Sequence, residues 1–281
     1  MARSEPIRLG SNLVMTLVYT FLIASSLVMA FPIVWMVVTA LKTPGEIFSV
    51  PPVLLPAEPQ WHNFPDAWGS GPFNRFFLNS FLVSAATTLI VLAVSTLAGY
   101  AFAKLRFFGA AILFVVVIST MMIPEQITLI PVFLFLRDID LINTRLGVIL
   151  PLTASGFGTF LMRQYITSIP SSLLDAARID GCSEFGIYWR IVLPLTRPAL
   201  AALTIFTFMG SWDAFLWPLV ILSSEGKFTL PLGLARFNEE YYSEPHFTMA
   251  VSFISILPVL LVFLISQRAF IKGIALTGMK E

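Results

Sequence analysis

The chain has 281 residues, of which 57% are hydrophobic and only 12% are charged, and its mean hydropathy is +0.85. An average soluble domain is about 25% charged, so the composition excludes a water-soluble enzyme, a disordered protein and a disulfide-stapled secreted module. The net charge of +1 argues against a large nucleic-acid-binding surface, which needs clustered basic residues.

Six stretches are long and apolar enough to cross the hydrocarbon core of a membrane, which takes about 20 residues of helix. In chain order they cover approximately residues 13–41, 77–103, 110–136, 144–165, 199–222 and 247–270. The first is much longer than the apolar region of a signal peptide, so we expect it to be a span. The third is the least regular, because Pro124, Glu125 and Gln126 interrupt its apolar run and a proline kinks a membrane helix.

The distribution of positive charge predicts how these spans are oriented. If both termini are cytoplasmic, the inside segments carry Arg3, Arg8, Lys104, Arg106, Arg163, Arg178, Arg190, Arg197, Arg268, Lys272 and Lys280. The outside segments then carry only Lys42, Arg75, Arg137, Arg145, Lys227 and Arg236. This asymmetry follows the positive-inside rule, and we therefore expect cytoplasmic N- and C-termini.

Two external loops of this topology are substantial. Residues 42–76 are rich in proline, which fixes φ and interrupts helices, so we expect an ordered but irregular loop. Residues 223–246 mix charged and aromatic side chains, which suits either contact with another protein or a solvated loop. The sequence shows no internal repeat, so we predict a single polytopic transmembrane permease domain over residues 1–281.

The most informative segment is the cytoplasmic loop at about residues 165–198, which is long for a connection within a compact bundle. Pro170 followed by Ser171 or Ser172 predicts a helix that begins with a serine cap. Gly181 predicts the end of this helix, because glycine adopts a positive φ without penalty. A second helical stretch is expected over residues 184–193, with Pro194 as its stop.

The pattern in this loop resembles the EAA loop of binding-protein-dependent ABC importers. The matching residues are Asp175-Ala176-Ala177, Asp180-Gly181 and Ile191-Val192-Leu193-Pro194, at the spacing of that family. Asp175 stands where the family usually has glutamate, so the carboxylate is kept but is one methylene shorter. Beyond the loop, similarity to MalG-type sugar permeases extends over Asn79-Ser80, Gly99-Tyr100-Ala101-Phe102-Ala103, Trp212-Asp213, Phe215-Leu216-Trp217-Pro218 and Gln267-Arg268.

This resemblance implies an all-α integral membrane protein with six transmembrane helices and the type I ABC importer permease (MetI-like) fold. It implies a permease subunit of an ATP-driven sugar importer in a bacterial or archaeal inner (plasma) membrane. The implied partners are a MalF-like second permease subunit, two cytosolic ABC ATPase subunits, an extracytoplasmic solute-binding protein and membrane lipid, with no nucleic acid. The chain contains no Gly-x-x-x-x-Gly-Lys-Ser/Thr motif. We therefore expect a non-catalytic subunit without its own cofactor, with ATP and Mg bound by the ATPase subunits.

In this family the loop couples the permease to the ATPases. The residues to which the resemblance assigns this role are Asp175, Ala176, Ala177, Asp180, Gly181, Ile191 and Pro194. The small residues would allow close approach to a groove on the ATPase, and Asp175 and Asp180 would offer charge or cap contacts. The alternatives are that Gly181 only turns the chain and that Asp180 only caps the following helix.

Ionisable residues within a bilayer are costly and usually functional, and a sugar pathway needs aromatic faces and polar groups for hydroxyls. The candidate pathway residues are Asn79, Glu125, Gln126, Trp212, Asp213 and Trp217. Alternatively, Asp213 bonds a neighbouring helix and the tryptophans belong to an interfacial belt. His62 and His246 are far apart in the sequence and have no cysteine or acidic cluster nearby at ligand spacing, so no metal site is expected.

Two other functions remain open from the sequence. A permease for a polyol or a glycerol-phosphate-type solute would have the same features. A self-sufficient proton-coupled transporter or channel would use Glu125 and Asp213 as ion sites, but it leaves the segment from Asp175 to Pro194 unexplained.

Overall fold

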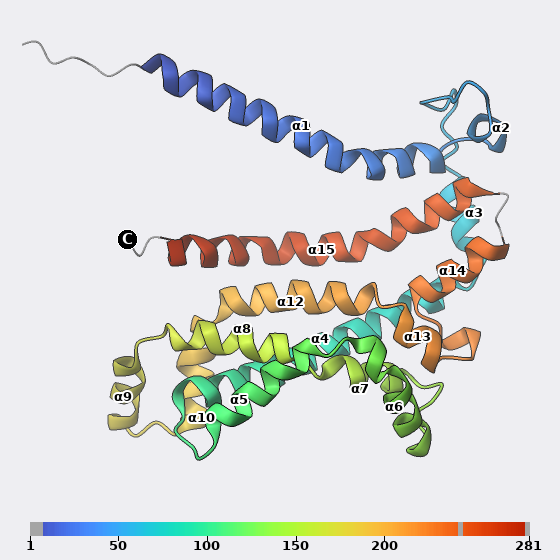
Figure 1. The fold of residues 1–281 in the computed structure, drawn as a ribbon. Coiled ribbons are helices and arrows are strands. Elements are labelled where there is room, and N and C mark those ends of the chain that lie inside the picture. The colour runs from blue at the N-terminus through green and yellow to red at the C-terminus, as the bar shows by residue number, and fades with distance from the viewer. Residues whose placement is uncertain (1–7, 241–243, 279–281) are drawn as a thin grey trace, which may run out of the picture. The chain divides into compact units, whose positions relative to one another are not determined.

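The computed structural model describes residues 8–240 and 244–278, and within them every regular element is a helix (Figure 1). The first helices are α1 (Arg8–Ala40), α2 (Pro44–Ile47), α3 (Asn63–Gly69), α4 (Phe73–Lys104), α5 (Ala110–Ser119), η1 (Thr120–Met122), α6 (Glu125–Asp138), α7 (Arg145–Thr153) and α8 (Gly156–Thr167). They are followed by α9 (Ser171–Ile179), α10 (Glu184–Ile187), the π-helix η2 (Tyr188–Val192), α11 (Leu193–Leu195), α12 (Arg197–Trp212), α13 (Leu216–Ile221), η3 (Glu225–Lys227), α14 (Leu230–Glu240) and α15 (Pro245–Gly278). The prediction of an all-α chain is confirmed.

Three helices are individually long and apolar enough to cross a membrane, within Val14–Ala40, Phe73–Lys104 and Pro245–Gln267. Three further pairs meet the same criterion together but are bent: Ala110–Met122 with Glu125–Asp138 by 103°, Arg145–Thr153 with Gly156–Thr167 by 44°, and Glu184–Leu195 with Arg197–Trp212 by 76°. Counting each bent pair as one span gives up to six spans in the described residues, which agrees with the predicted number.

The sharpest bend lies at Pro124, where the sequence predicted an irregular span. Ile123 is extended and Pro124 precedes the first turn of α6, so the apolar run turns by 103° between η1 and α6. Proline has no N–H to continue the preceding helical ladder, which explains the break at this residue.

The fifth predicted span, residues 199–222, is not one continuous helix. α12 ends at Trp212 with Asp213 as its C-cap, and α13 is a separate helix that begins at Leu216. Pro218 gives the physical reason, because its ring would clash with the carbonyl one turn earlier in a continuous helix, whereas the first turn of α13 tolerates it.

The chain groups into two compact units. The first comprises residues 1–71 and 237–254, and the second comprises residues 72–236 and 255–281. Whether the whole chain acts as one transmembrane domain stays a prediction.

Within the first unit, the proline-rich segment after α1 is ordered by side chain to backbone hydrogen bonds. The Nζ of Lys42 donates to the carbonyl oxygen of Val53 at 2.6 Å. The carboxylate of Glu46 accepts from the N–H of Thr43 at 2.9 Å and from the N–H of Ala57 at 2.8 Å. The hydrogen bond from the N–H of Ala57 is the largest cause that lowers the pKa of Glu46, followed by the bond from Thr43. Both bonds stabilise the ionised carboxylate. The predicted ordered but irregular loop is confirmed for residues 42–71.

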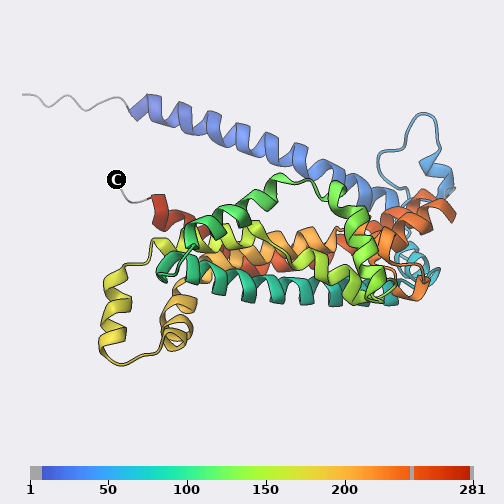
Figure 2. The same ribbon diagram turned by 60° about the horizontal axis from the view of Figure 1, so that its bottom comes forward.

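The second unit is built around α4, which packs against α8, α12 and α7 (Figures 1 and 2). Glycines allow the closest of these approaches. A Cβ at Gly99 would lie 2.7 Å from the Cβ of Met162, and one at Gly158 would lie 2.4 Å from the Oγ of Ser95. Small residues at helix contacts serve this purpose in membrane proteins, where close packing replaces the hydrophobic effect.

Candidate functional site

The predicted cytoplasmic segment forms a short helix, α9, and a second helical run from α10 to α11. In Figures 1 and 2, α9 lies beyond the ends of α4 and α8. The second run packs beside the last turns of α4, where Tyr188 contacts Thr96 and Tyr100. α9 begins at Ser171, but its N-cap is Pro170 and no side chain caps it, so the predicted serine cap is wrong. Gly181 has φ +81° and ends the helix as predicted, with the N–H of Cys182 donating to the carbonyl oxygen of Ala177 at 2.9 Å.

The second helical run starts and stops differently from the prediction. Ser183 caps it, since its Oγ accepts from the N–H of Gly186 at 3.1 Å, so Asp180 is not the cap. Pro194 does not stop the run: it lies in the first turn of α11, and the bend follows at Thr196. The π-helix directly before Pro194 widens the turn where the proline cannot donate, which lets the chain continue.

α9 has one buried face and one exposed face. Leu174 is 1% exposed and Ala177 is 6% exposed, and both pack into a cluster that includes Met162 and Ile187. Ala177 was expected to face a partner, and this is corrected, because its methyl group fills the chain's own core. Asp175, Ala176, Ile179 and Asp180 are exposed, and Ile179 is 87% exposed.

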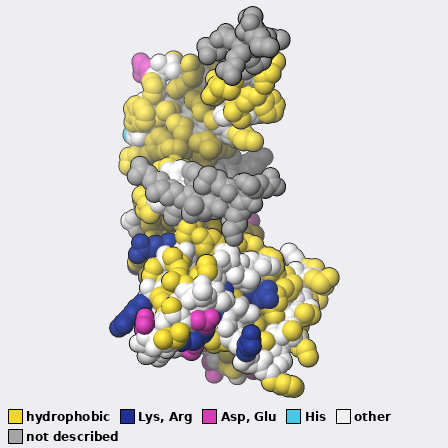
Figure 3. All heavy atoms as spheres, turned by 90° about the vertical axis from the view of Figure 1, so that its left-hand side faces the viewer, with side chains coloured by type: hydrophobic (Ala, Val, Ile, Leu, Met, Phe, Trp, Pro, Cys, Tyr) yellow, Lys and Arg dark blue, Asp and Glu magenta, His cyan; other side chains and the backbone are white. Residues whose placement is uncertain are grey.

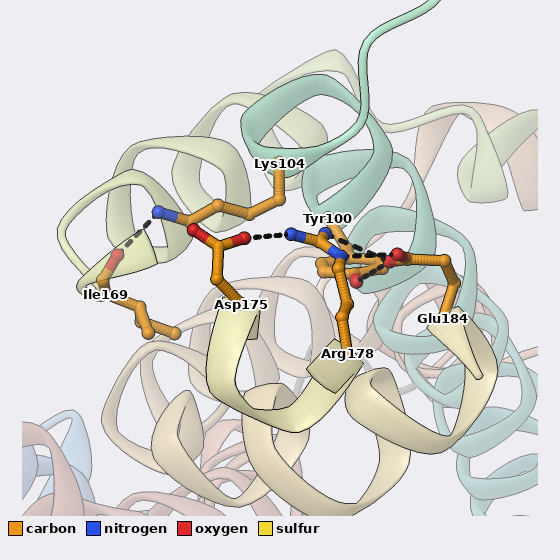
Figure 4. A network of polar contacts seen from close by, with 6 residues as sticks. All are labelled: Tyr100, Lys104, Ile169, Asp175, Arg178 and Glu184. Carbon is orange, nitrogen blue, oxygen red and sulfur yellow. Dashed lines mark hydrogen bonds and ion pairs between the residues drawn. The ribbon is translucent and has the colours of Figure 1, made fainter. Parts of the chain in front are cut away.

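A polar network ties α9 to the end of the membrane helix α4 (Figure 4). Arg178 donates through Nε to Glu184 at 2.7 Å and through Nη1 to Asp175 at 2.6 Å. The hydroxyl of Tyr100, on α4, donates to the other oxygen of Glu184 at 2.5 Å. The hydrogen bond to Glu184 is the main cause that raises the pKa of Arg178 above its usual value. The network therefore joins the two sides of the Gly181 turn to the membrane helix.

A second tie holds the chain just before α9. The Nζ of Lys104, the last residue of α4, donates to the carbonyl oxygen of Ile169 at 2.5 Å. Figure 3 views the second unit from the side on which α9 lies, and positive and negative side chains are close together on this face. The ion pairs that Arg178 makes with Asp175 and Glu184 agree with this view.

Sequence reasoning did not select Lys104, Arg178 or Glu184. The one available signal was the pair of opposite charges at Arg178 and Glu184, which flank the predicted tight turn at Gly181. The contact with Tyr100 crosses 84 positions of the chain and has no local signal.

A cavity of about 300 Å³ lies in the second unit among α4, α6, α7, α8, α12 and α13. Its lining includes the aromatic rings of Phe157, Phe206 and Trp217. Thr87 and Ser211 also line it, are 1% and 7% exposed, and have hydroxyl oxygens without a hydrogen-bond partner within the described structure.

Of the six predicted pathway residues, Glu125 and Trp217 line this cavity. Asn79 instead has a structural role: its Nδ2 donates to the carbonyls of Gly226 and Phe228 at 3.1 and 2.9 Å, and its Oδ1 accepts from Arg145 at 2.7 Å.

The other three pathway candidates also lie outside the cavity lining. Gln126 and Asp213 are exposed, and Asp213 is the C-cap of α12. Trp212 is buried, donates from Nε1 to the carbonyl oxygen of Ser255 at 3.0 Å and stacks on Phe208. Because Trp212 and Trp217 are both buried within the protein, the interfacial-belt alternative is wrong for them.

Helices able to span a membrane, with a helical segment beyond their ends, define a polytopic membrane protein. Residues 95–276 match the family described as "Binding-protein-dependent transport system inner membrane component", and the chain belongs to this family. It is thus an inner-membrane permease component of an ABC transporter, as the EAA-loop resemblance indicated, and the MetI-like fold is confirmed.

Named relatives support this placement over nearly the full chain. The arabinooligosaccharides transport system permease protein AraQ of Bacillus subtilis is 37% identical over 264 residues, covering 92% of this chain and 94% of AraQ. The sn-glycerol-3-phosphate transport system permease protein UgpE of Pectobacterium atrosepticum is 34% identical and covers 91% of this chain and 94% of its own. A chain of a bacterial ABC transporter that imports the acidic polysaccharide alginate has a TM-score of 0.83 at 25% identity, covering 95% of this chain and 100% of its own.

Proposed function

We propose that the chain forms half of the translocation pathway of an ATP-driven sugar importer and couples that pathway to cytosolic ATPases through the segment from Asp175 to Pro194. The sugar assignment is supported by relatives named for arabinooligosaccharide transport and for alginate import. The relative named for sn-glycerol-3-phosphate makes a glycerol-phosphate-type solute the second candidate.

The proposed assembly has a MalF-like second permease subunit, two ABC ATPase subunits and an extracytoplasmic solute-binding protein. The family description, which is binding-protein-dependent, supports the last of these. ATP and Mg bind to the ATPase subunits, and this subunit is not catalytic. The excess of lysine and arginine on the inside segments supports cytoplasmic termini.

The observation that carries the coupling role is the link between an exposed helix face and a membrane helix. Asp175, Ala176 and Ile179 lie on the exposed side of α9 and form the proposed ATPase contact. On the same helix, Arg178 is bonded to Glu184, which in turn is bonded to Tyr100 of α4. A displacement of α9 by the ATPase is therefore passed to α4 through short, charge-assisted hydrogen bonds rather than through a flexible loop.

The docking test is the variant Ile179→Asp, which places a charge on the exposed face of α9 without touching the core. We expect the ATPase to co-purify with this variant at least 10-fold less than with the parent chain, while membrane insertion is unchanged. Leu54→Asp is the matched control, because Leu54 is also exposed but lies in the predicted external loop. Normal co-purification with Ile179→Asp would contradict the docking surface.

A transport measurement separates this function from a proton-coupled one. In proteoliposomes containing the whole importer, sugar uptake should require ATP and should survive collapse of the proton gradient. Uptake without ATP that follows the proton gradient would favour the alternative class.

A further inference from the structure

The described lining of the cavity in the second unit carries negative charge and no positive charge. Among the described residues that line it, Glu125 alone carries a charge, and it is negative. Glu125 is exposed. An anionic solute placed in the cavity would meet its carboxylate without a cation in the described lining, and repulsion between like charges at close range disfavours binding.

Two hydroxyl groups of the lining lack partners. The Oγ1 of Thr87 and the Oγ of Ser211 are buried at the cavity wall and make no hydrogen bond in the described structure. Leaving a buried polar group unpaired is costly, so each hydroxyl favours rotation about χ1 toward an occupant that can bond it. A hydroxyl both donates and accepts, and it therefore pairs well with the hydroxyls of a neutral solute.

Aromatic rings supply the apolar part of the lining. Phe157 and Phe206 meet edge to face at a centroid distance of 5.8 Å, and Trp217 lies on the lining from α13. A mostly apolar wall with a few directed polar groups is typical of small-molecule sites, and about 300 Å³ is at the small end of their range. This size suits one sugar ring rather than a whole oligosaccharide.

We propose that this cavity holds one ring of a neutral, hydroxyl-rich solute, and that Glu125 disfavours solutes bearing phosphate or carboxylate groups. The inference rests on the proposed function in taking this occupant to be the transported solute. It distinguishes the chain from its relatives named for sn-glycerol-3-phosphate and for the acidic polysaccharide alginate, since both of those solutes are anionic.

Gly210 is a position at which the cavity can be labelled chemically, in a test that does not depend on transport. Gly210 lines the cavity, and a Cβ added there meets no atom within 4 Å, so Gly210→Cys adds a thiol without a clash. Replacing the only native thiol by Cys182→Ser removes the background. The full chain with its partner subunits in membranes is treated with cationic and anionic methanethiosulfonate reagents of equal size, without ATP.

We expect the cationic reagent to label Gly210→Cys on the order of 10-fold faster than the anionic one, because of the carboxylate. Glu125→Gln should bring this ratio close to one. Gly69→Cys is the matched control, since its added Cβ also meets nothing within 4 Å but lies outside the cavity lining, so its ratio should not respond to Glu125→Gln.

Protection by solute identifies the occupant. A neutral arabinotriose should slow the labelling of Gly210→Cys several-fold, and an alginate trisaccharide at the same concentration should not. The proposal would be overturned if Gly210→Cys were not labelled, or if Glu125→Gln left the ratio of cationic to anionic labelling rates unchanged. It would also be overturned if the alginate trisaccharide protected as well as arabinotriose. Because labelling needs neither ATP nor uptake, failure here is distinct from failure of sugar import by the whole transporter.

Discussion

Arg178 is the centre of the polar network that connects α9 to the membrane helix α4. Its planar guanidinium bonds carboxylates on both sides of the Gly181 turn, a geometry that lysine does not reproduce. These ion pairs are partly exposed, and such pairs contribute at most about 1 kcal/mol to stability. Their value therefore lies in fixing the position of α9 rather than in holding the fold together.

The hydroxyl of Tyr100 tests this positioning role. Tyr100→Phe removes the bond to Glu184 but keeps the ring in the core. We expect the number of sugars imported per ATP to fall several-fold, with a loss of stability of about 1 kcal/mol. The readouts are ATP hydrolysis and uptake measured together in proteoliposomes.

Tyr188→Phe is the matched control for Tyr100→Phe. Its hydroxyl pairs with Thr96 at 2.9 Å in the same core but takes no part in the Arg178 network. It should lose similar stability without uncoupling. Equal uncoupling by both variants would mean that packing, and not the network, is responsible.

At the scale of elements, the contact between α4 and α8 is set by glycine. At Gly99, an added Cβ would approach both the Cβ of Met162 and the backbone N of Arg163 within 3 Å, and neither atom can move aside cheaply. At Gly210 on α12 the same addition meets open space. The two glycines therefore differ in their physical roles: Gly99 allows close packing of two helices, and Gly210 leaves space in the cavity lining.

Alanine substitutions at these two positions should have opposite effects. Gly99→Ala should destabilise the protein by about 1–3 kcal/mol because it overpacks a helix contact. Gly210→Ala should leave stability unchanged or raise it by up to about 1 kcal/mol, since alanine is the better helix former. Thermal unfolding of the purified protein in detergent measures both, and a Gly99→Ala variant as stable as the parent would refute the packing assignment.

The predicted external loop of the first unit should respond to acid. The pKa of Glu46 is lowered, so its contribution to the loop is fully present above the usual glutamate pKa of about 4.3 and is lost as the pH falls through the lower, folded-state value. Cleavage of the 47–57 segment by a protease that is active from about pH 3 to about pH 6 should therefore rise only below about pH 4.

Variants of the same loop provide the comparison. Glu46→Gln should be cleaved readily already at pH 6, because the neutral amide makes weaker bonds to the N–H groups of Thr43 and Ala57. Glu58→Gln changes the same charge nearby and should behave like the parent chain. Cleavage of the parent that does not depend on pH would contradict the role of Glu46.

Local features of these elements were predictable from the sequence, and long-range partners were not. Pro124 and Gly181 act through their own backbone geometry, so the bend and the helix end could be predicted. Pro194 has an effect that depends on the π turn before it, and no sequence pattern indicated that turn. The structural role of Asn79 depends on Arg145, which lies 66 positions away.

At the scale of the whole molecule, the proposed roles depend on which side of the membrane each segment faces. α9 can meet a cytosolic ATPase only if the segment from Asp175 to Pro194 is cytoplasmic. Cys182 lies directly after Gly181, is partly buried and is the only thiol of the chain, so it reports on this segment alone.

A membrane-impermeant maleimide should label Cys182 in inverted vesicles and not in intact cells. Co-expression of the ATPase should then protect it. A thiol moved to the exposed start of α9, Ser172→Cys with Cys182→Ser, should give the same pattern at a faster rate. Labelling from outside intact cells would overturn the orientation and the importer topology with it.

α9 is short, and this determines how its amide hydrogens exchange with solvent. A helix of nine residues does not persist by itself in water. Its order comes from Leu174 and Ala177 in the core and from the bond between Arg178 and Glu184. The amides of α9 should therefore exchange together, at a rate set by the opening of its anchors rather than by fraying of the helix. This exchange rate would report directly on movement at the ends of the helices that contact α9.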